Sequence, residues 1–318
     1  MKKYWETIKN VFPIVGFVLV LVIFSIATKG ELLAPKTLVT ILSQVMLTAL
    51  VSIGSVFIFG SGCFDMSVGG TLCMSAVVGC YAGIATGSIW AMLLACLAVS
   101  LFLNVLKGLF AAYVDVPLFI VTIVLGSVLS ALVLLIMGSE TTIFLKNAVS
   151  PIPELSANGK LILNATILLG YYVGCVVLFN YTRLGREVKL LGGNPVTFRQ
   201  TGLNAPKVKL LSFIVGGVGV ALAAFVMLMT TRTAGASSAG SVGTDVMTAL
   251  VLGGMPLSGG PRSRISAGLI GAATITVLNL GLQMIGLGTA AVQISRAIVF
   301  LTVVYVASMT YRTKLLPR

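Results

Sequence analysis

The acidic residues nearest to the apolar stretches are the first candidates for chemistry in this sequence. Asp65, Asp115 and Asp245 each lie at a junction marked by Gly or Pro, close to the end of an apolar run. An acid in such a place could hold a cation, relay a proton or contact a polar solute. The same position also suits a helix cap or a loop hydrogen bond, and we expect this structural role to be the commoner one.

Other reactive residue types are sparse. The sequence contains no His, which is the commonest proton carrier near neutral pH and the commonest metal ligand. Residues 30–37, GELLAPKT, are similar to a phosphate-binding loop, but Pro35 occupies the place of the second Gly and offers no N–H to a phosphate. The five Cys lack CxxC spacing and are expected to be apolar fillers. We therefore predict no metal, no cofactor and no enzymatic activity.

The composition indicates which elements must position these residues. Of the 318 residues, 58% are hydrophobic and only 9% are charged, with a mean hydropathy of +1.09. Soluble domains carry about 25% charged residues, so lipid must surround much of this surface. The 35 Gly suit close packing of helices in lipid. The expected fold is an all-α, polytopic membrane protein in one domain, residues 1–318.

Nine apolar runs are long enough for a spanning helix of about 20 residues. They are 11–28, 38–60, 67–87, 89–106, 117–138, 161–180, 210–231, 265–286 and 290–310. A tenth candidate, 246–257, has only twelve residues and is interrupted by Gly253 and Gly254. Its length leaves open whether it spans fully or is broken.

The distribution of Lys and Arg favours ten crossings with both termini in the cytoplasm. The inner side then holds fifteen basic residues: Lys2, Lys3, Lys9, Lys107, Arg183, Arg186, Lys189, Arg199, Lys207, Lys209, Arg262, Arg264, Arg312, Lys314 and Arg318. The outer side holds five, and without the tenth crossing the ratio becomes ten to ten. Arg296 falls inside the last run, where it could pair within the protein, although we expect it to snorkel to the outer surface.

A basic segment interrupts the apolar runs at about 181–209. Six Lys or Arg stand there against one acid, Glu187. Asn194 as cap, Pro195 at the first helical position and Gly202 as stop predict one short cytoplasmic helix. Such a helix could be the docking site of a separate motor protein, or the segment could be a solvated loop that only fixes orientation. A basic cytoplasmic face is what membrane insertion requires, and no aromatic-interleaved basic patch accompanies it, so we do not expect nucleic acid as a partner.

Four stretches in order resemble the ribose-type (simple-sugar) ABC importer permeases, of the monosaccharide/branched-chain amino acid permease family. The basic segment TRLGREVKLLGGNPVTFRQTGLNAPKVK looks like their cytoplasmic coupling loop. The other three are GCFDMSVGG at 62–70, VPLFIVTIVLGS at 116–127 and SVGTDVMTALVLGGMPLSGGPRSRISAGLIGA at 241–272. The resemblance as a whole extends over nearly the whole chain.

The resemblance implies a type II ABC importer-like permease of the bacterial plasma (inner) membrane. Its expected partners are separate ATP-binding cassette ATPase subunits, an extracytoplasmic solute-binding protein and a second permease, identical or different. In that assembly ATP closure would move the short helix and open the permease alternately to each side. The residues expected to couple ATPase motion are Gly193, Asn194, Phe198 and Gly202.

Polar residues in the apolar runs, and the loop that contains Asp65, are candidates for the translocation pathway, because a sugar needs hydrogen-bonding groups in a cavity. They are Gln44, Asp65, Asn104 and Asn279, with Asn164 and Gln283 as further possibilities. Each could equally form a hydrogen bond between helices, which is the commoner role. The expected cargo is a monosaccharide such as ribose. The alternatives are a nucleoside or another small polar solute, and a stand-alone carrier or channel.

Overall fold

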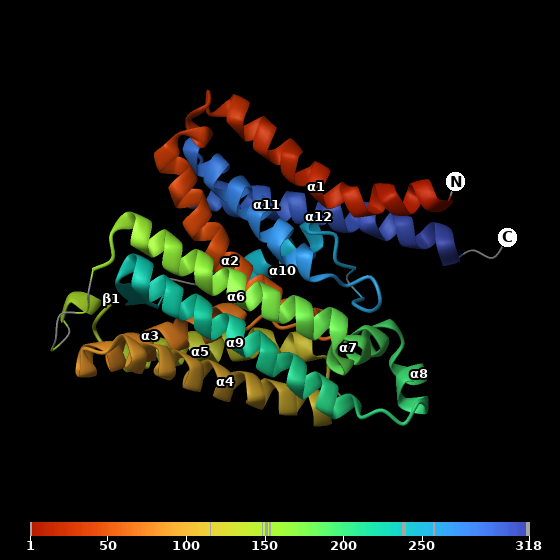
Figure 1. The fold of residues 1–318 in the computed structure, drawn as a ribbon, viewed down its shortest axis with the longest axis horizontal. Coiled ribbons are helices and arrows are strands. Elements are labelled where there is room, and N and C mark those ends of the chain that lie inside the picture. The colour runs from red at the N-terminus through yellow and green to blue at the C-terminus, as the bar shows by residue number, and fades with distance from the viewer. Residues whose placement is uncertain are drawn as a thin grey trace.

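The computed structural model of the chain describes residues 2–114, 116–147, 149, 152, 154–236, 240–256 and 258–315, and most of this part is helical (Figure 1). Asp115, one of the three acids singled out above, lies outside the described residues. Seven helices within the described ranges are long and apolar enough to cross a membrane. They are α2 (Pro35–Gly60), α3 (Val68–Thr86), α4 (Ile89–Tyr113), α5 (Leu118–Met137), α6 (Ala157–Tyr181), α9 (Ala205–Thr231) and α11 (Ile265–Met284).

The remaining predicted runs are also helical. The first and last helices are α1 (Lys2–Ala27) and α12 (Thr289–Leu315). Each contains an apolar stretch that is shorter than those of the seven spanning helices. The tenth candidate is α10 (Val242–Leu252), whose eleven residues extend about 16 Å at 1.5 Å per residue. This is about half of the 30 Å hydrocarbon core of a bilayer. The described residues also form two short helices between α6 and α9, α7 (Arg183–Gly193) and α8 (Pro195–Gln200), and two 3-10 turns, η1 (Glu31–Leu33) and η2 (Leu145–Asn147).

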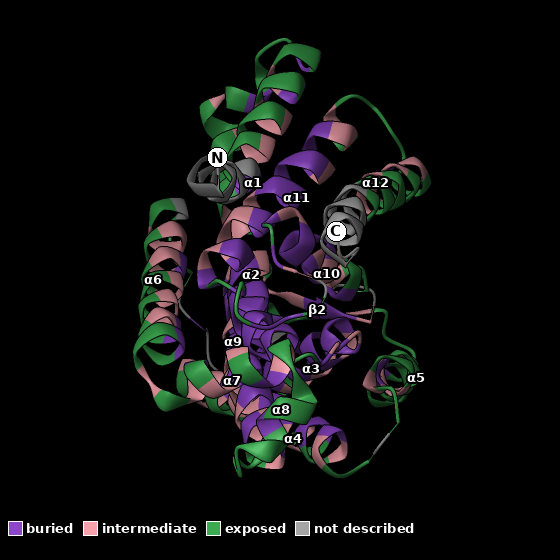
Figure 2. Cartoon of the chain, turned by 90° about the vertical axis from the view of Figure 1, so that its right-hand side faces the viewer, coloured by how far each residue is buried: buried purple, intermediate pink, exposed green. Residues whose placement is uncertain are grey.

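The core lies where α2, α3, α4 and α9 pack together. Figure 2 shows buried residues concentrated in α2, α3 and α9, whereas α5, α6 and α12 are largely exposed on their outer faces. Helix backbones approach closely in this core. A Cβ on Gly54 of α2 would lie 3.0 Å from the Gly216 Cα of α9, and one on Gly217 would lie 3.0 Å from the Asn104 Cβ of α4. Small residues thus provide the tight contacts that lipid-embedded helices need.

A small sheet marks one end of the helical bundle. Strand β1 (Thr142–Phe144) pairs antiparallel with β2 (Thr233–Gly235), with Ile143 opposite Ala234. After β2 the chain passes along α3, where the Cys73 thiol donates to the Ala236 carbonyl at 3.5 Å. It then reaches the start of α10, where a Cβ on Gly243 would lie 2.7 Å from the Met66 carbonyl oxygen. A partly non-helical connection therefore leads from the sheet into the short helix α10.

The structure corrects the expected position of Lys107. The fourth apolar run was predicted to end at residue 106, which placed this lysine in an inner loop. Helix α4 instead continues to Tyr113, and Lys107 is buried within it. A buried ammonium is tolerated here because it has a carboxylate partner, described below.

Candidate functional site

The segment between α6 and α9 forms the projection at one end of the bundle (Figure 1). It contains α7 (Arg183–Gly193) and α8 (Pro195–Gln200). The Asn194 side-chain oxygen accepts hydrogen bonds from the backbone N–H groups of Val196 at 3.0 Å and Thr197 at 3.1 Å. Pro195 takes the first helical position, and Gly202 has a φ of +74° beyond the end of the helix. The predicted short helix is therefore confirmed, with its cap and its stop.

Helix α7 was missed by the sequence analysis, which expected a single helix in this segment. Its inner face carries Leu184, Val188 and Leu191, at spacings of four and three residues. That spacing is the signal of an amphipathic helix, and the charged residues between these positions, Arg186, Glu187 and Lys189, obscured it. Val188 and Leu191 are buried and belong to the main hydrophobic core. This packing fixes α7 against the bundle.

The residues of α8 divide between the protein interior and the outside. Phe198 is 2% exposed and belongs to the same hydrophobic core as Val188 and Leu191. Val196, in contrast, is 67% exposed. A surface hollow is lined by Pro195, Val196, Arg199 and Gln200. Phe198 therefore anchors α8 to the bundle, and the other side chains are the ones available to a partner.

Lys189 links α7 to the end of α6. Its ammonium lies 4.5 Å from the centre of the Phe179 ring and 3.4 Å from the Asn180 side-chain oxygen. Partial burial and the positive charge of Arg264 lower the pKa of Lys189. A Cβ on Gly193, the last residue of α7, would lie 3.0 Å from the Pro261 Cδ, so the loop preceding α11 lies beside α7.

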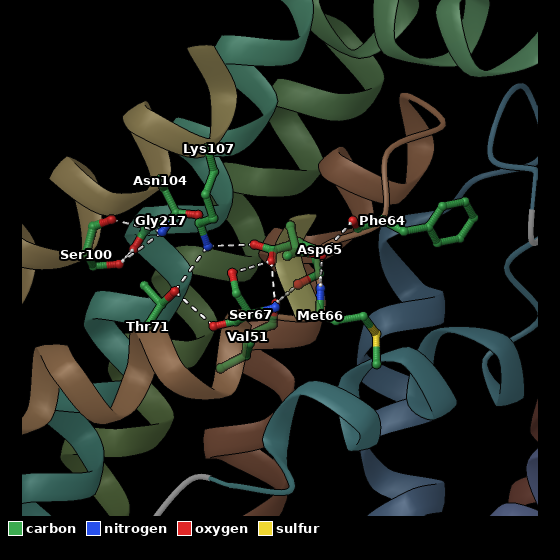
Figure 3. Close-up of polar contacts among 12 residues, drawn as sticks. Val51, Phe64, Asp65, Met66, Ser67, Thr71, Ser100, Asn104, Lys107 and Gly217 are labelled. Carbon is green, nitrogen blue, oxygen red and sulfur yellow. Dashed lines mark hydrogen bonds and ion pairs between the residues drawn. The ribbon is translucent and has the colours of Figure 1, made fainter. Parts of the chain in front are cut away.

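A buried ion pair lies between the start of α3 and α4 (Figure 3). The Lys107 ammonium is 2.6 Å from the Asp65 carboxylate, with side-chain exposures of 2% and 1%. Lys107 also donates to the Thr71 hydroxyl at 3.1 Å. The second Asp65 oxygen accepts from the Ser67 backbone N–H at 2.8 Å and from the Ser67 hydroxyl at 2.6 Å. All members of this cluster are buried, so the pair fixes the first turn of α3 against α4.

Asn104 extends the polar contacts one turn along α4. Its amide donates to the Ser100 carbonyl at 2.9 Å, and the Ser100 hydroxyl donates to the Gly217 carbonyl of α9 at 2.7 Å (Figure 3). Two of the expected pathway residues, Asp65 and Asn104, thus lie near one another. Both form their hydrogen bonds within the protein: Asp65 bonds to Lys107 of α4, whereas Asn104 bonds to Ser100 within α4 itself.

A second charged cluster joins α10, α11 and α12. Arg296 forms an ion pair with Asp245, and its Nε donates to the Asn279 side-chain oxygen at 3.2 Å. The Ser241 hydroxyl donates to Asp245 at 3.1 Å. The expectation that Arg296 snorkels to the surface is wrong, because its side chain is only 12% exposed and has a carboxylate in reach. Asn279 therefore contacts another helix rather than an open space.

We expect Arg296→Met to lower the melting temperature of the detergent-solubilised protein, because Asp245 would lose its counter-charge while remaining largely buried. A buried polar group left without its partner costs about 1–3 kcal/mol, and a charged one more. Asp245→Asn combined with Arg296→Met should recover most of the loss, as measured by fluorescence-detected thermal unfolding. Equal melting temperatures for the single variant and the parent protein would show that the pair does not hold α12.

The other expected pathway residues are dispersed. Gln44 of α2 and Gln283 of α11 are exposed. The Asn164 amide of α6 donates to the Thr230 hydroxyl of α9 at 3.2 Å. Neither Gln44 nor Asn279 joins the cluster around Asp65. Across the described ranges, no three His, Cys, Asp or Glu side chains gather closely enough to hold a metal ion.

Comparisons with known proteins relate this chain to the permease components of transport systems. A family model described as "Branched-chain amino acid transport system / permease component" matches residues 37–307. The ribose import permease protein RbsC of Escherichia coli is 28% identical over 286 residues, covering 85% of each chain. The xylose transport system permease protein XylH of Haemophilus influenzae is 28% identical over 343 residues, covering 87% of this chain and 90% of its own.

Two further comparisons extend this result. The fructose import permease protein FrcC of Rhizobium meliloti is 26% identical over 290 residues, covering 86% of this chain and 78% of its own. A solved chain, described as part of a metal-chelate type ABC transporter in an inward-facing conformation, superposes with a TM-score of 0.54. It shares 17% sequence identity and covers 93% of this chain and 98% of its own, so it supports the fold alone.

Proposed function

This chain belongs to the branched-chain amino acid transport system / permease component family, and from that premise we propose that it is the transmembrane permease of an ATP-driven monosaccharide importer. The observation that carries the proposal is the agreement between the family match and the relatives, which are named for ribose, xylose and fructose. These names favour a monosaccharide such as ribose over the nucleoside alternative. The protein is located in the bacterial plasma membrane.

Ten crossings with both termini in the cytoplasm form part of the proposal. Ten apolar segments contain helices, and α10 with the described residues before it, 233–236 and 240–241, would make one broken crossing. Non-helical backbone at membrane depth is tolerated where it is buried in protein or lines a cavity, which suits this connection. Without the buried Lys107, fourteen of the fifteen inner basic residues remain against five outer ones. Residues 1–318 would then be a single membrane domain.

The same proposal assigns roles to the projection formed by α7 and α8. The exposed face of α8, with Pro195, Val196 and Arg199, would contact an ATPase subunit. Gly193, Asn194, Phe198 and Gly202 would hold that helix in the position and direction needed to transmit motion. An extracytoplasmic binding protein would deliver the solute at the opposite end. A second permease would complete the pathway.

The pathway itself is proposed from fewer observations. Asp65 and Asn104 would hold the helices that line the pathway in place and would not contact the solute, because their side chains form hydrogen bonds within the protein. Gln44 is exposed on α2 and would be free to contact a solute. Asn279 would position Arg296 at the junction of α10, α11 and α12.

Copurification followed by reconstitution tests this function. The tagged chain, isolated from its native membrane in mild detergent, should carry an ATP-binding cassette ATPase that mass spectrometry identifies. Proteoliposomes of that complex with its binding protein should accumulate radiolabelled ribose only when ATP is supplied on the ATPase side. An ATPase variant that cannot hydrolyse ATP provides the control. Uptake without nucleotide, or a chain that always purifies alone, would contradict the proposal in favour of a stand-alone carrier.

A further inference from the structure

Three segments of the chain meet at the end of the bundle that carries α8, and each segment makes this contact with glycine residues. They are the end of α2 at Gly60, the end of α7 at Gly192 and Gly193, and the loop between α10 and α11 at Gly259 and Gly260. We refer to these five residues as the glycine junction. The Gly260 backbone N–H donates to the Gly60 carbonyl at 3.0 Å.

At Gly192, Gly259 and Gly260 the glycine junction leaves no room for a side chain between the backbones. A Cβ on Gly192 would overlap the Gly60 carbonyl oxygen, and one on Gly260 would lie 2.9 Å from the Gly193 Cα. A Cβ on Gly259 would overlap the Phe59 carbonyl oxygen. Real Cβ atoms do not approach other heavy atoms so closely. Backbone atoms in direct contact repel steeply when compressed, whereas long side chains can change rotamer to absorb a displacement.

Helix α8 is attached to this junction without a flexible linker. Gly193 is the last residue of α7, and Asn194 both ends α7 and caps α8. On its other side, α8 leads into residues 201–204, which are all exposed. There Gly202 has a positive φ, and a Cβ on it would meet nothing within 4 Å. The N-terminal end of α8 is therefore held directly against the glycine junction, whereas its C-terminal end is joined to α9 by an exposed segment with free space around it.

The elements on the other side of the junction are themselves packed backbone against backbone. A Cβ on Gly253, just after α10, would overlap the Ala267 carbonyl of α11, and one on Gly271 would overlap the Ala249 carbonyl of α10. A Cβ on Gly268 would lie 3.0 Å from the Ile53 backbone nitrogen of α2. A displacement of the glycine junction would thus be transmitted to α2, α10 and α11 together.

We propose that the glycine junction positions α8 so that its displacement moves the end of α2 and the α10–α11 loop as one rigid body. This inference rests on the proposed function, because α8 must be the part that an ATPase moves. It assigns positioning roles to Gly60, Gly192 and Gly260. It also identifies α2, α10 and α11 as the helices that receive the motion first.

A disulfide across the junction tests whether its parts move together. Gly193 and Pro261 are both exposed, and a Cβ on Gly193 would lie 3.4 Å from the Pro261 Cγ. Cysteines at these two positions should therefore bond on mild oxidation. In the reconstituted importer, ATP-driven uptake by the oxidised Gly193→Cys/Pro261→Cys complex should stay within about twofold of its reduced form. The controls are the two complexes that carry only one of these substitutions, Gly193→Cys or Pro261→Cys.

Two results would overturn the inference. One is a fall in uptake of tenfold or more on oxidation that a thiol reductant reverses, since the joined segments would then have to move apart during transport. The other is failure of the bond to form, since the segments would not be in contact. Absence of ATP-driven uptake in the parent complex would instead refute the proposed function, so the two failures are distinguishable.

Substitution of the junction provides an independent measurement. Gly192→Ala should lower uptake at least tenfold, because the new methyl group must separate α7 from Gly60, while ATPase subunits still copurify and hydrolyse ATP. Gly174→Ala in α6 is the matched control, because a Cβ there meets nothing within 4 Å. Normal uptake by Gly192→Ala would contradict the inference.

Discussion

Lys107→Met should strongly destabilise the protein and reduce the amount that folds in the membrane. The substitution leaves the Asp65 carboxylate buried at 1% exposure without its counter-charge. Removal of one partner of a buried ion pair costs about 3–5 kcal/mol. The remaining donors to Asp65, the Ser67 N–H and hydroxyl, satisfy hydrogen bonds but carry no charge. The measurement is thermal unfolding of the detergent-solubilised protein, together with its yield from membranes.

The pair itself, rather than either charge alone, should account for this loss. Asp65→Asn combined with Lys107→Met removes both charges and retains an oxygen that can accept from Ser67. Neutral replacement of a buried pair is often close to neutral for stability, so the double variant should recover most of the melting temperature. Lys36→Met, at an exposed lysine, is the control for loss of a positive charge. A double variant as unstable as Lys107→Met would show that the two charges do not stabilise one another.

The long helices of this protein could be predicted because lipid imposes a simple requirement. A spanning helix needs about 20 continuous apolar residues, and each of the nine long runs coincides with a helix. The short helix α10 was less well delimited. Its predicted window, 246–257, begins four residues late, because Asp245 and Thr244 are not apolar and yet lie in the first turn. The polar start of α10 is stabilised by Arg296, from a helix that hydropathy cannot relate to it.

The partners of the polar residues could not be predicted at all. Asp65 and Lys107 are 42 positions apart, and Asp245 and Arg296 are separated by the whole of α11. No local pattern relates such residues, because the packing of the helices decides which side chains meet. For the same reason the polar pathway candidates could be found by residue type, but their contacts could not. Asn279 proves to bond to a neighbouring helix, whereas Asn104 bonds to Ser100 within α4, and it is the Ser100 hydroxyl that reaches α9.

The short helix α8 shows the opposite situation, since local chemistry sufficed to predict it. An Asn cap, a Pro at the first position and a Gly after the last turn specify a helix without any tertiary contact. What the sequence did not reveal is the direction in which α8 faces. Phe198 points into the core, so the proposed coupling would depend on its packing, and the exposed Val196 face would carry the contact with the ATPase.

Phe198→Ala should therefore uncouple ATP hydrolysis from transport. The substitution removes a fully buried aromatic side chain, which costs about 3–5 kcal/mol in a well-packed core. A six-residue helix has little stability of its own, so this loss should release α8 from the bundle. We expect solute uptake to fall at least tenfold in proteoliposomes, with ATP hydrolysis by the copurified subunits retained. The ratio of ATP hydrolysed to solute transported measures the effect.

Two further variants separate anchoring from contact. Phe198→Leu keeps an apolar side chain in the same place and should restore most of the uptake, because volume and hydrophobicity are largely conserved. Val196→Ala truncates a neighbouring side chain on the exposed face, so it should leave α8 docked and change uptake only through the contact with the ATPase. If Phe198→Ala transports as efficiently as the parent complex, then α8 does not need its anchor, and the proposed route of coupling through this helix is wrong.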